Sequence, residues 1–234
     1  MELQDFAVKG ITSQLRFVTP APTFIDQRGH LIEALMREHE LSEWGYGQDF
    51  VDAFRADGSV TLRVASRELR AMFENVESTT EVKKATKSFL GWGLDSLGVE
   101  RLGYVGVRSF RIAAADSFRA LNEWLLDRLM PGHAQLLQPF GSKSSDSGWV
   151  LEFHDKDPKH NLRIGPMTPE QAMAQVFRDQ DTDHYPPQFL FLDVDRLYSD
   201  EEMSASEALQ RWESAFDRNL EIGETLSRRL RPEP

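Results

Sequence analysis

Apolar and polar residues alternate along several short stretches of the chain, which is the pattern of half-buried β-strands. Between positions 11 and 18, Ile11, Leu15 and Phe17 fall on one side of an extended chain, and Thr19-Pro20 follows them. Positions 50–55 and 60–64 also alternate, and they flank Asp57-Gly58, a dipeptide typical of hairpin turns. The pattern predicts a strand over 11–18, a hairpin over 50–64 and a further strand over 69–73.

Other stretches repeat apolar residues every three or four positions, as amphipathic helices do. Such a run follows Ser78-Thr79-Thr80-Glu81, a capping box, and ends before Gly98. We expect a second helix from Asp116 to Pro131-Gly132, and further helices after capping boxes at 168–171 and 204–207. Strands are predicted over 103–112, 134–140 and 188–194, with a hairpin over 149–164. The stretch 31–39 fits either a helix or a strand.

The expected elements repeat in order after Pro131-Gly132. Each part contains a strand, a hairpin, a helix, a strand and a helix, and the second part ends in a long helix. We therefore predict an α+β fold with two similar halves, residues 1–131 and 132–234. Each half is expected to be an antiparallel sheet with helices packed on one face.

Composition narrows the class of protein. The chain of 234 residues is 40% hydrophobic and 28% charged, which is ordinary for a folded protein. It has no cysteine, which excludes disulfides and thiolate chemistry, and we expect no cofactor. Residues 1–10 lack the features of a secretory signal, and no apolar run is long enough to span a membrane, so a cytoplasmic location is expected. A net charge of −11 disfavours binding to nucleic acid.

Two short motifs resemble those of a known family. Gly106-Val107-Arg108-Ser109-Phe110 follows a long helix, and Phe191-Leu192-Asp193-Val194-Asp195 precedes a C-terminal helix. In this order and spacing the chain resembles a sporadically distributed bacterial family of uncharacterised proteins of about 250 residues. Ser109 and Arg111 depart from the Tyr and Asn of the family pattern. The resemblance implies the same fold and carries no established activity.

Histidines and aspartates gather in two loops that are candidates for a metal site. The first holds His154, Asp157 and His160, and the second holds Asp181 and His184. Imidazole and carboxylate groups are common metal ligands, but no recognised ligand spacing is present. Solvated loops are the alternative interpretation, because Asp-Pro-Lys between two strands is typical of an exposed hairpin turn.

Charged residues within two predicted strands are further candidates. Asp193 and Asp195 lie two apart, so both point to one face, as paired catalytic carboxylates would require. The alternative is the solvent face of a half-buried strand. Arg108 and Arg111 are candidates for gripping an anionic ligand, or for pairing internally with an acid of the final helix.

These observations favour a protein without catalytic activity. We expect a protein-binding module, such as an immunity, antitoxin or defence-associated protein, that binds a basic protein through a sheet face or edge. A homodimer is a further expectation. One alternative is a metal-dependent hydrolase or nuclease that uses the acidic and histidine-bearing loops. Another is a binder of a small anionic ligand at the junction of the halves.

Overall fold

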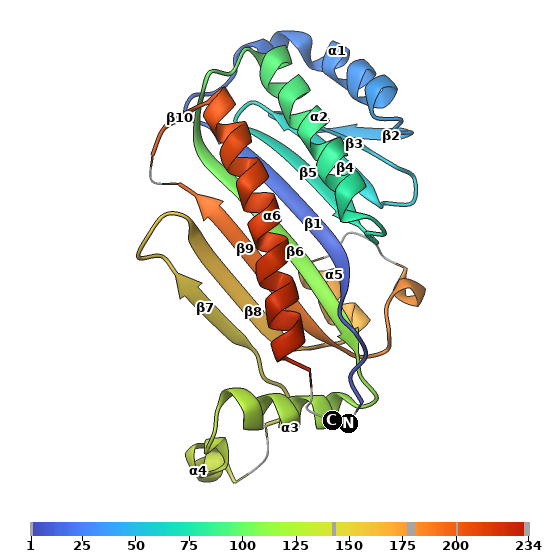
Figure 1. Cartoon of the computed structure of the whole chain (residues 1–234). Coiled ribbons are helices and arrows are strands. Elements are labelled where there is room, and N and C mark those ends of the chain that lie inside the picture. Colours follow the sequence, from blue (N-terminus) through green and yellow to red (C-terminus); the bar gives the residue numbers. More distant parts are fainter. Residues whose placement is uncertain (1, 142–143, 177–180, 200, 232–234) are drawn as a thin grey trace.

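A computed structural model describes residues 2–141, 144–176, 181–199 and 201–231, and its fold is α+β (Figure 1). The strands are β1 (Ala7–Phe17), β2 (Glu43–Tyr46), β3 (Phe50–Phe54), β4 (Val60–Ala65), β5 (Glu68–Glu74), β6 (Arg101–Ala114), β7 (Trp149–Phe153), β8 (Lys159–Met167), β9 (Phe189–Tyr198) and β10 (Met203–Ser204). The α-helices are α1 (Thr23–Glu38), α2 (Thr79–Leu97), α3 (Phe118–Leu129), α4 (His133–Leu137), α5 (Pro169–Gln175) and α6 (Ala205–Arg229). Short 3-10 turns lie at Gln138–Phe140 and Thr182–His184.

The described strands form one antiparallel sheet. Its centre is the pairing of β1 with β6, from Ala7 opposite Ile112 to Phe17 opposite Leu102. From β1 the order continues outward through β5, β4, β3 and β2, and from β6 through β9, β8 and β7, while β10 adds to β6. The expectation of a separate sheet in each half is therefore wrong. Each central strand pairs on both sides, β1 with β5 and β6 and β6 with β1 and β9, so the two parts of the chain share one hydrogen-bonded sheet. The division at residues 131 and 132 stays a prediction.

Three helices, α1, α2 and α6, cover one face of the sheet (Figure 1). Every second residue of β1 points to this layer, and Ile11 and Leu15 are buried there. The longest helix, α6, contributes Trp212 and Phe216, which are both buried. Burying a side chain of this size stabilises the fold by about 1.5–3 kcal/mol. Most of the buried apolar side chains lie under these three helices, so this layer holds the main core.

The opposite face is covered in part by α5, which Figure 1 places behind the sheet. In β9, Leu190 and Leu192 pack with α3 and α6, whereas Phe189 and Phe191 pack with Ala172 of α5. The expectation that the helices pack on one face of the sheet is therefore wrong. The cause lies in the sequence of β9, where the consecutive residues from Phe189 to Leu192 are all apolar, so both faces of the strand need a covering layer.

Most of the predicted helix starts are confirmed. Ser78, Thr168 and Ser204 accept hydrogen bonds from backbone N–H groups in the first turns of α2, α5 and α6. The start of α3 is capped by Ser117 instead of Asp116. The strand predicted over 134–140 is wrong, because the chain turns at Gly132 with φ of 83° and continues as α4. The helices of the described residues are all too short or too polar to cross a membrane.

A buried amide connects α6 to the sheet. Asn219 is fully buried, and its Nδ2 donates to the carbonyl oxygens of Val107 at 3.0 Å and Val194 at 2.8 Å. Its Oδ1 accepts a hydrogen bond from the hydroxyl of Ser109 at 2.5 Å. Because these partners lie on β6 and β9, one side chain fixes the helix over both strands.

Candidate functional site

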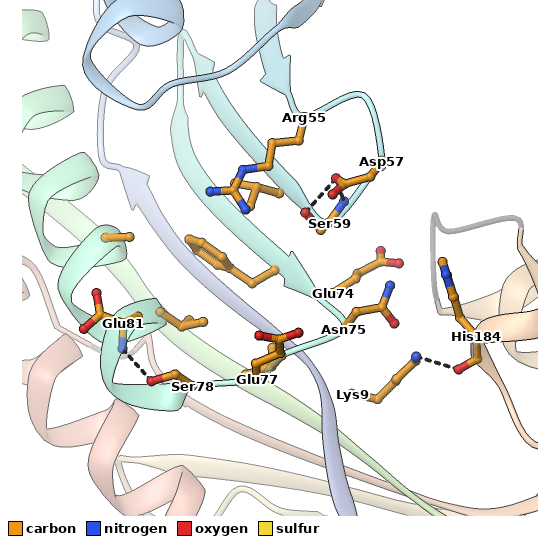
Figure 2. A pocket seen from close by; sticks show the side chains of 15 residues that line it. Lys9, Arg55, Asp57, Ser59, Glu74, Asn75, Glu77, Ser78, Glu81 and His184 are labelled. Atoms are coloured by element: carbon orange, nitrogen blue, oxygen red, sulfur yellow. Dashed lines mark hydrogen bonds between the residues drawn. The ribbon is translucent and has the colours of Figure 1, made fainter.

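A cleft of about 890 Å³ opens where several elements end, and its rim is rich in carboxylates (Figure 2). It lies among the β3–β4 turn, the end of β5, the first turn of α2, the start of β1 and His184. We call it the acidic cleft. Its lining residues are Lys9, Arg55, Asp57, Ser59, Val60, Phe73, Glu74, Asn75, Val76, Glu77, Ser78, Glu81, Val82, Ala85 and His184.

Local sequence signals place the acidic residues at this rim. Gly58 has φ of 72°, which permits the tight β3–β4 turn that carries Asp57. Asp57 accepts hydrogen bonds from the hydroxyl of Ser59 at 2.7 Å and from its backbone N–H at 2.9 Å. These two bonds lower the pKa of Asp57. On the other side of the cleft, the Ser78 cap starts α2 and thereby fixes the position of Glu81.

The acidic cleft combines negative charge with an apolar floor. Four carboxylates line it, against the two permanent cations Lys9 and Arg55. Lys9 is held to one side, since its Nζ donates to the backbone oxygen of His184 at 2.8 Å and lies over the ring of Tyr185. The floor is formed by apolar side chains, namely Val60, Phe73, Val76, Val82 and Ala85. Such a surface suits a long cationic side chain, whose stem packs on apolar groups while its charge meets carboxylates.

The candidates Arg108 and Asp193 lie elsewhere and bind each other. The guanidinium of Arg108 donates from Nε to Oδ1 of Asp193 at 2.9 Å and from Nη2 to Oδ2 at 2.6 Å. Arg108 thus has an internal carboxylate partner, but it comes from β9 and not from the final helix. The pair borders a cleft of about 440 Å³ that also contains Arg163 and Asp146. Because these charges balance, this cleft has no excess positive charge to attract an anion.

Asp195 lies opposite Arg108 in the strand register, on the same face of the sheet. Its Oδ2 accepts a hydrogen bond from Asn161 at 3.2 Å, and Asn161 in turn contacts Nε2 of His154 at 2.7 Å. Burial raises the pKa of Asp195, and the hydrogen bond from Asn161 and the charge of Arg108 oppose this shift only in part. Burial also raises the pKa of the nearby Tyr104 to about 12, with the charge of Asp195 adding to the effect.

The raised pKa of Asp195 makes a prediction about stability. A carboxyl whose pKa is higher in the folded state destabilises the fold when it is ionised, and this penalty disappears as the pH falls through that pKa towards the unfolded value. We expect Asp195→Asn to have a higher free energy of unfolding than the wild type at pH 7, with the difference shrinking as the pH approaches about 4. Urea unfolding at several pH values measures it. The exposed Asp155→Asn controls for the loss of one negative charge. A wild type at least as stable as Asp195→Asn at pH 7 would contradict the prediction.

Arg111 points to the other face of the sheet because it lies three residues from Arg108 on one strand. It is 4% exposed, packs beneath Gly223 of α6, and donates from Nη2 to the backbone oxygen of Leu220 at 2.9 Å. Burial lowers the pKa of its guanidinium. The two arginines therefore cannot grip the same ligand.

The five metal candidates are divided between distant elements. His154, Asp157 and His160 lie in or beside the β7–β8 hairpin, where His160 contacts Arg196 at 3.1 Å. Asp181 and His184 lie in the turn before β9, with 3.7 Å between carboxylate and ring. Within the part of the chain that the structure describes, no three histidine or acidic side chains are placed to hold a metal ion.

Comparison with known proteins adds no assignment. No family model matches the sequence, and the search of curated proteins finds no match. The sequence pattern identified the Asp57-Gly58 turn and the Ser78 cap but did not single out Glu74, Glu77 or Glu81 as candidates for a site. What it could not supply was the strand order, which brings these separate segments to one cleft.

Proposed function

We propose that the protein is a non-enzymatic binding module for a basic protein, and that the acidic cleft receives a lysine or arginine side chain of that partner. An immunity or antitoxin protein that neutralises a basic toxin belongs to this class. The observation that carries the proposal is the ring of carboxylates over an apolar floor in the acidic cleft.

The charges around the cleft support a cationic occupant. Arg55 already projects into this space, and its charge adds to the lowering of the pKa of Asp57, so the rim favours a nearby guanidinium (Figure 2). Glu81 lies in the first turn of α2, where its carboxylate offsets the positive end of the helix dipole. The helix end therefore does not repel a cation in the cleft. The overall charge of −11 adds long-range attraction, which speeds encounter with a basic partner.

The alternatives have less support. A metal-dependent hydrolase needs ligands that converge, and a binder of small anions needs an arginine whose charge is not already neutralised. In the described residues the histidine and aspartate candidates lie apart, and Arg108 is paired with Asp193.

The proposal predicts that Glu77→Gln/Glu81→Gln weakens binding of a fluorescent arginine-rich peptide about tenfold or more, measured by anisotropy at low salt. Each lost charge contact is worth on the order of 1 kcal/mol, and 1.4 kcal/mol corresponds to a tenfold change in affinity. Glutamine keeps the size of the side chain, so the fold should be retained.

A matched control separates the cleft from general electrostatics. Glu33→Gln/Asp127→Asn removes two carboxylates outside the acidic cleft and gives the same change in net charge. We expect it to alter the affinity less than twofold. Equal losses in both variants would mean that the peptide responds only to net charge. Pull-down from the native host then identifies the partner, which should be basic and should be lost with the cleft variant.

We also infer that the two parts of the chain repeat one structural unit. From β1 the sheet continues through β5, β4 and β3, and from β6 it continues through β9, β8 and β7. A helix follows the last strand of each part, α2 in one and α6 in the other. In this interpretation the second unit starts at β6, before the boundary at residues 131 and 132 expected from the sequence.

A further inference from the structure

The strand β7 forms an open edge of the sheet and carries exposed apolar side chains. Among the strands that the structure describes, it is the last in the sheet order and pairs with β8 along one side. Val150, Leu151 and Phe153 are 60%, 46% and 50% exposed. A sheet edge with unpaired backbone groups is a template for a further strand, and natural edges usually carry charges that prevent such pairing.

The two faces of β7 differ in character. Trp149 and Leu151 lie opposite Ile164 and Leu162 of β8, on the face where α3 packs. Phe153 follows at the same spacing, so this face of β7 is a continuous apolar row. Val150 and Glu152 lie on the other face, opposite Arg163 and Asn161.

We propose that β7 pairs antiparallel with β7 of a second copy of this chain, around a twofold axis at Leu151, to form a homodimer with one continuous sheet. This register places Leu151 opposite Leu151 and Trp149 opposite Phe153, so each apolar side chain of the row meets another. On the other face Val150 meets Glu152. An interface of this kind is isologous, because the same strand serves both copies.

The charge pattern of β7 favours a second copy as the occupant. Glu152 is the one charged residue of the strand, and in this register it meets Val150 and not another carboxylate. No like charges are opposed. A twofold axis at Glu152 would instead place two carboxylates against each other, which is destabilising. An axis at Val150 would place Phe153 opposite Ser147, which lies outside β7. Only the register at Leu151 uses all five residues of β7.

The first experiment uses the absence of cysteine in the chain. Residues directly opposite in an antiparallel pair have Cβ atoms about 4.5–5.5 Å apart, close to the spacing of a disulfide. Leu151→Cys should therefore form a disulfide-linked dimer on mild oxidation, seen by non-reducing electrophoresis. Glu33→Cys, an exposed site on α1, should stay monomeric under the same conditions. Equal cross-linking of both variants would overturn the proposal.

The second experiment tests the register by sedimentation equilibrium. Leu151→Lys places two ammonium groups together on the axis and should raise the dimer dissociation constant at least tenfold. Val150→Lys makes the same change one residue away, but there the lysine meets Glu152 of the second copy, so the dimer should persist. A wild type that is monomeric at high micromolar concentration, or a dimer unaffected by Leu151→Lys, would overturn the proposal. So would a monomer whose β7 binds only a foreign peptide.

Discussion

Replacing Asn219 by leucine is expected to lower the free energy of unfolding by about 3–5 kcal/mol. Leucine has a similar volume, so the loss comes from hydrogen bonding and not from a cavity. The substitution leaves the hydroxyl of Ser109 and the carbonyl oxygens of Val107 and Val194 without the partner they have in the folded protein. A buried polar group that loses its partner costs roughly 1–3 kcal/mol.

Urea unfolding monitored by circular dichroism measures this effect. The matched control is Ser109→Ala, which removes one of the three hydrogen bonds and no backbone contact, and should cost about 1 kcal/mol. If Asn219→Leu and Ser109→Ala destabilise the protein equally, the amide does not hold α6 to the two strands as its contacts indicate.

Asn219 also illustrates what the sequence could and could not predict. The spacing of Trp212, Phe216 and their neighbours predicts the buried face of α6, and the structure confirms it. Asn219 lies in the same phase of the helix, but a polar residue there gives no sign of its partners. Those partners come from strands more than 20 residues away, and only the tertiary arrangement identifies them.

In the sheet, too, only the features that depend on neighbouring residues were predictable. These are the alternation in β1, the Asp57-Gly58 hairpin and most of the helix caps. The pairing of β1 with β6 was not predictable, since both strands look equally suited to separate sheets. The acidic cleft depends on this pairing order, which explains why the sequence alone did not bring its carboxylates together. The exposed apolar residues of β7 were likewise invisible in the sequence, where they resemble any buried strand.

The pair of Arg108 and Asp193 gives the second large expected effect. The side chain of Asp193 is 3% exposed, whereas that of Arg108 is 35% exposed. Removing either partner leaves the other charge without its salt bridge, but the arginine can reach water and the aspartate cannot. We therefore expect Arg108→Met to destabilise the protein by about 3–5 kcal/mol and Asp193→Leu by less, about 2–3 kcal/mol.

A double-mutant cycle by urea unfolding tests whether this pair acts as a unit. The variant Arg108→Met/Asp193→Leu removes both charges and should be more stable than Arg108→Met alone, because no buried carboxylate is left unpaired. Strictly additive losses would show that the two groups act independently in the folded protein. They would also restore Arg108 as a candidate for binding an anionic ligand, because a guanidinium that gains nothing from Asp193 is available for another carboxylate or phosphate.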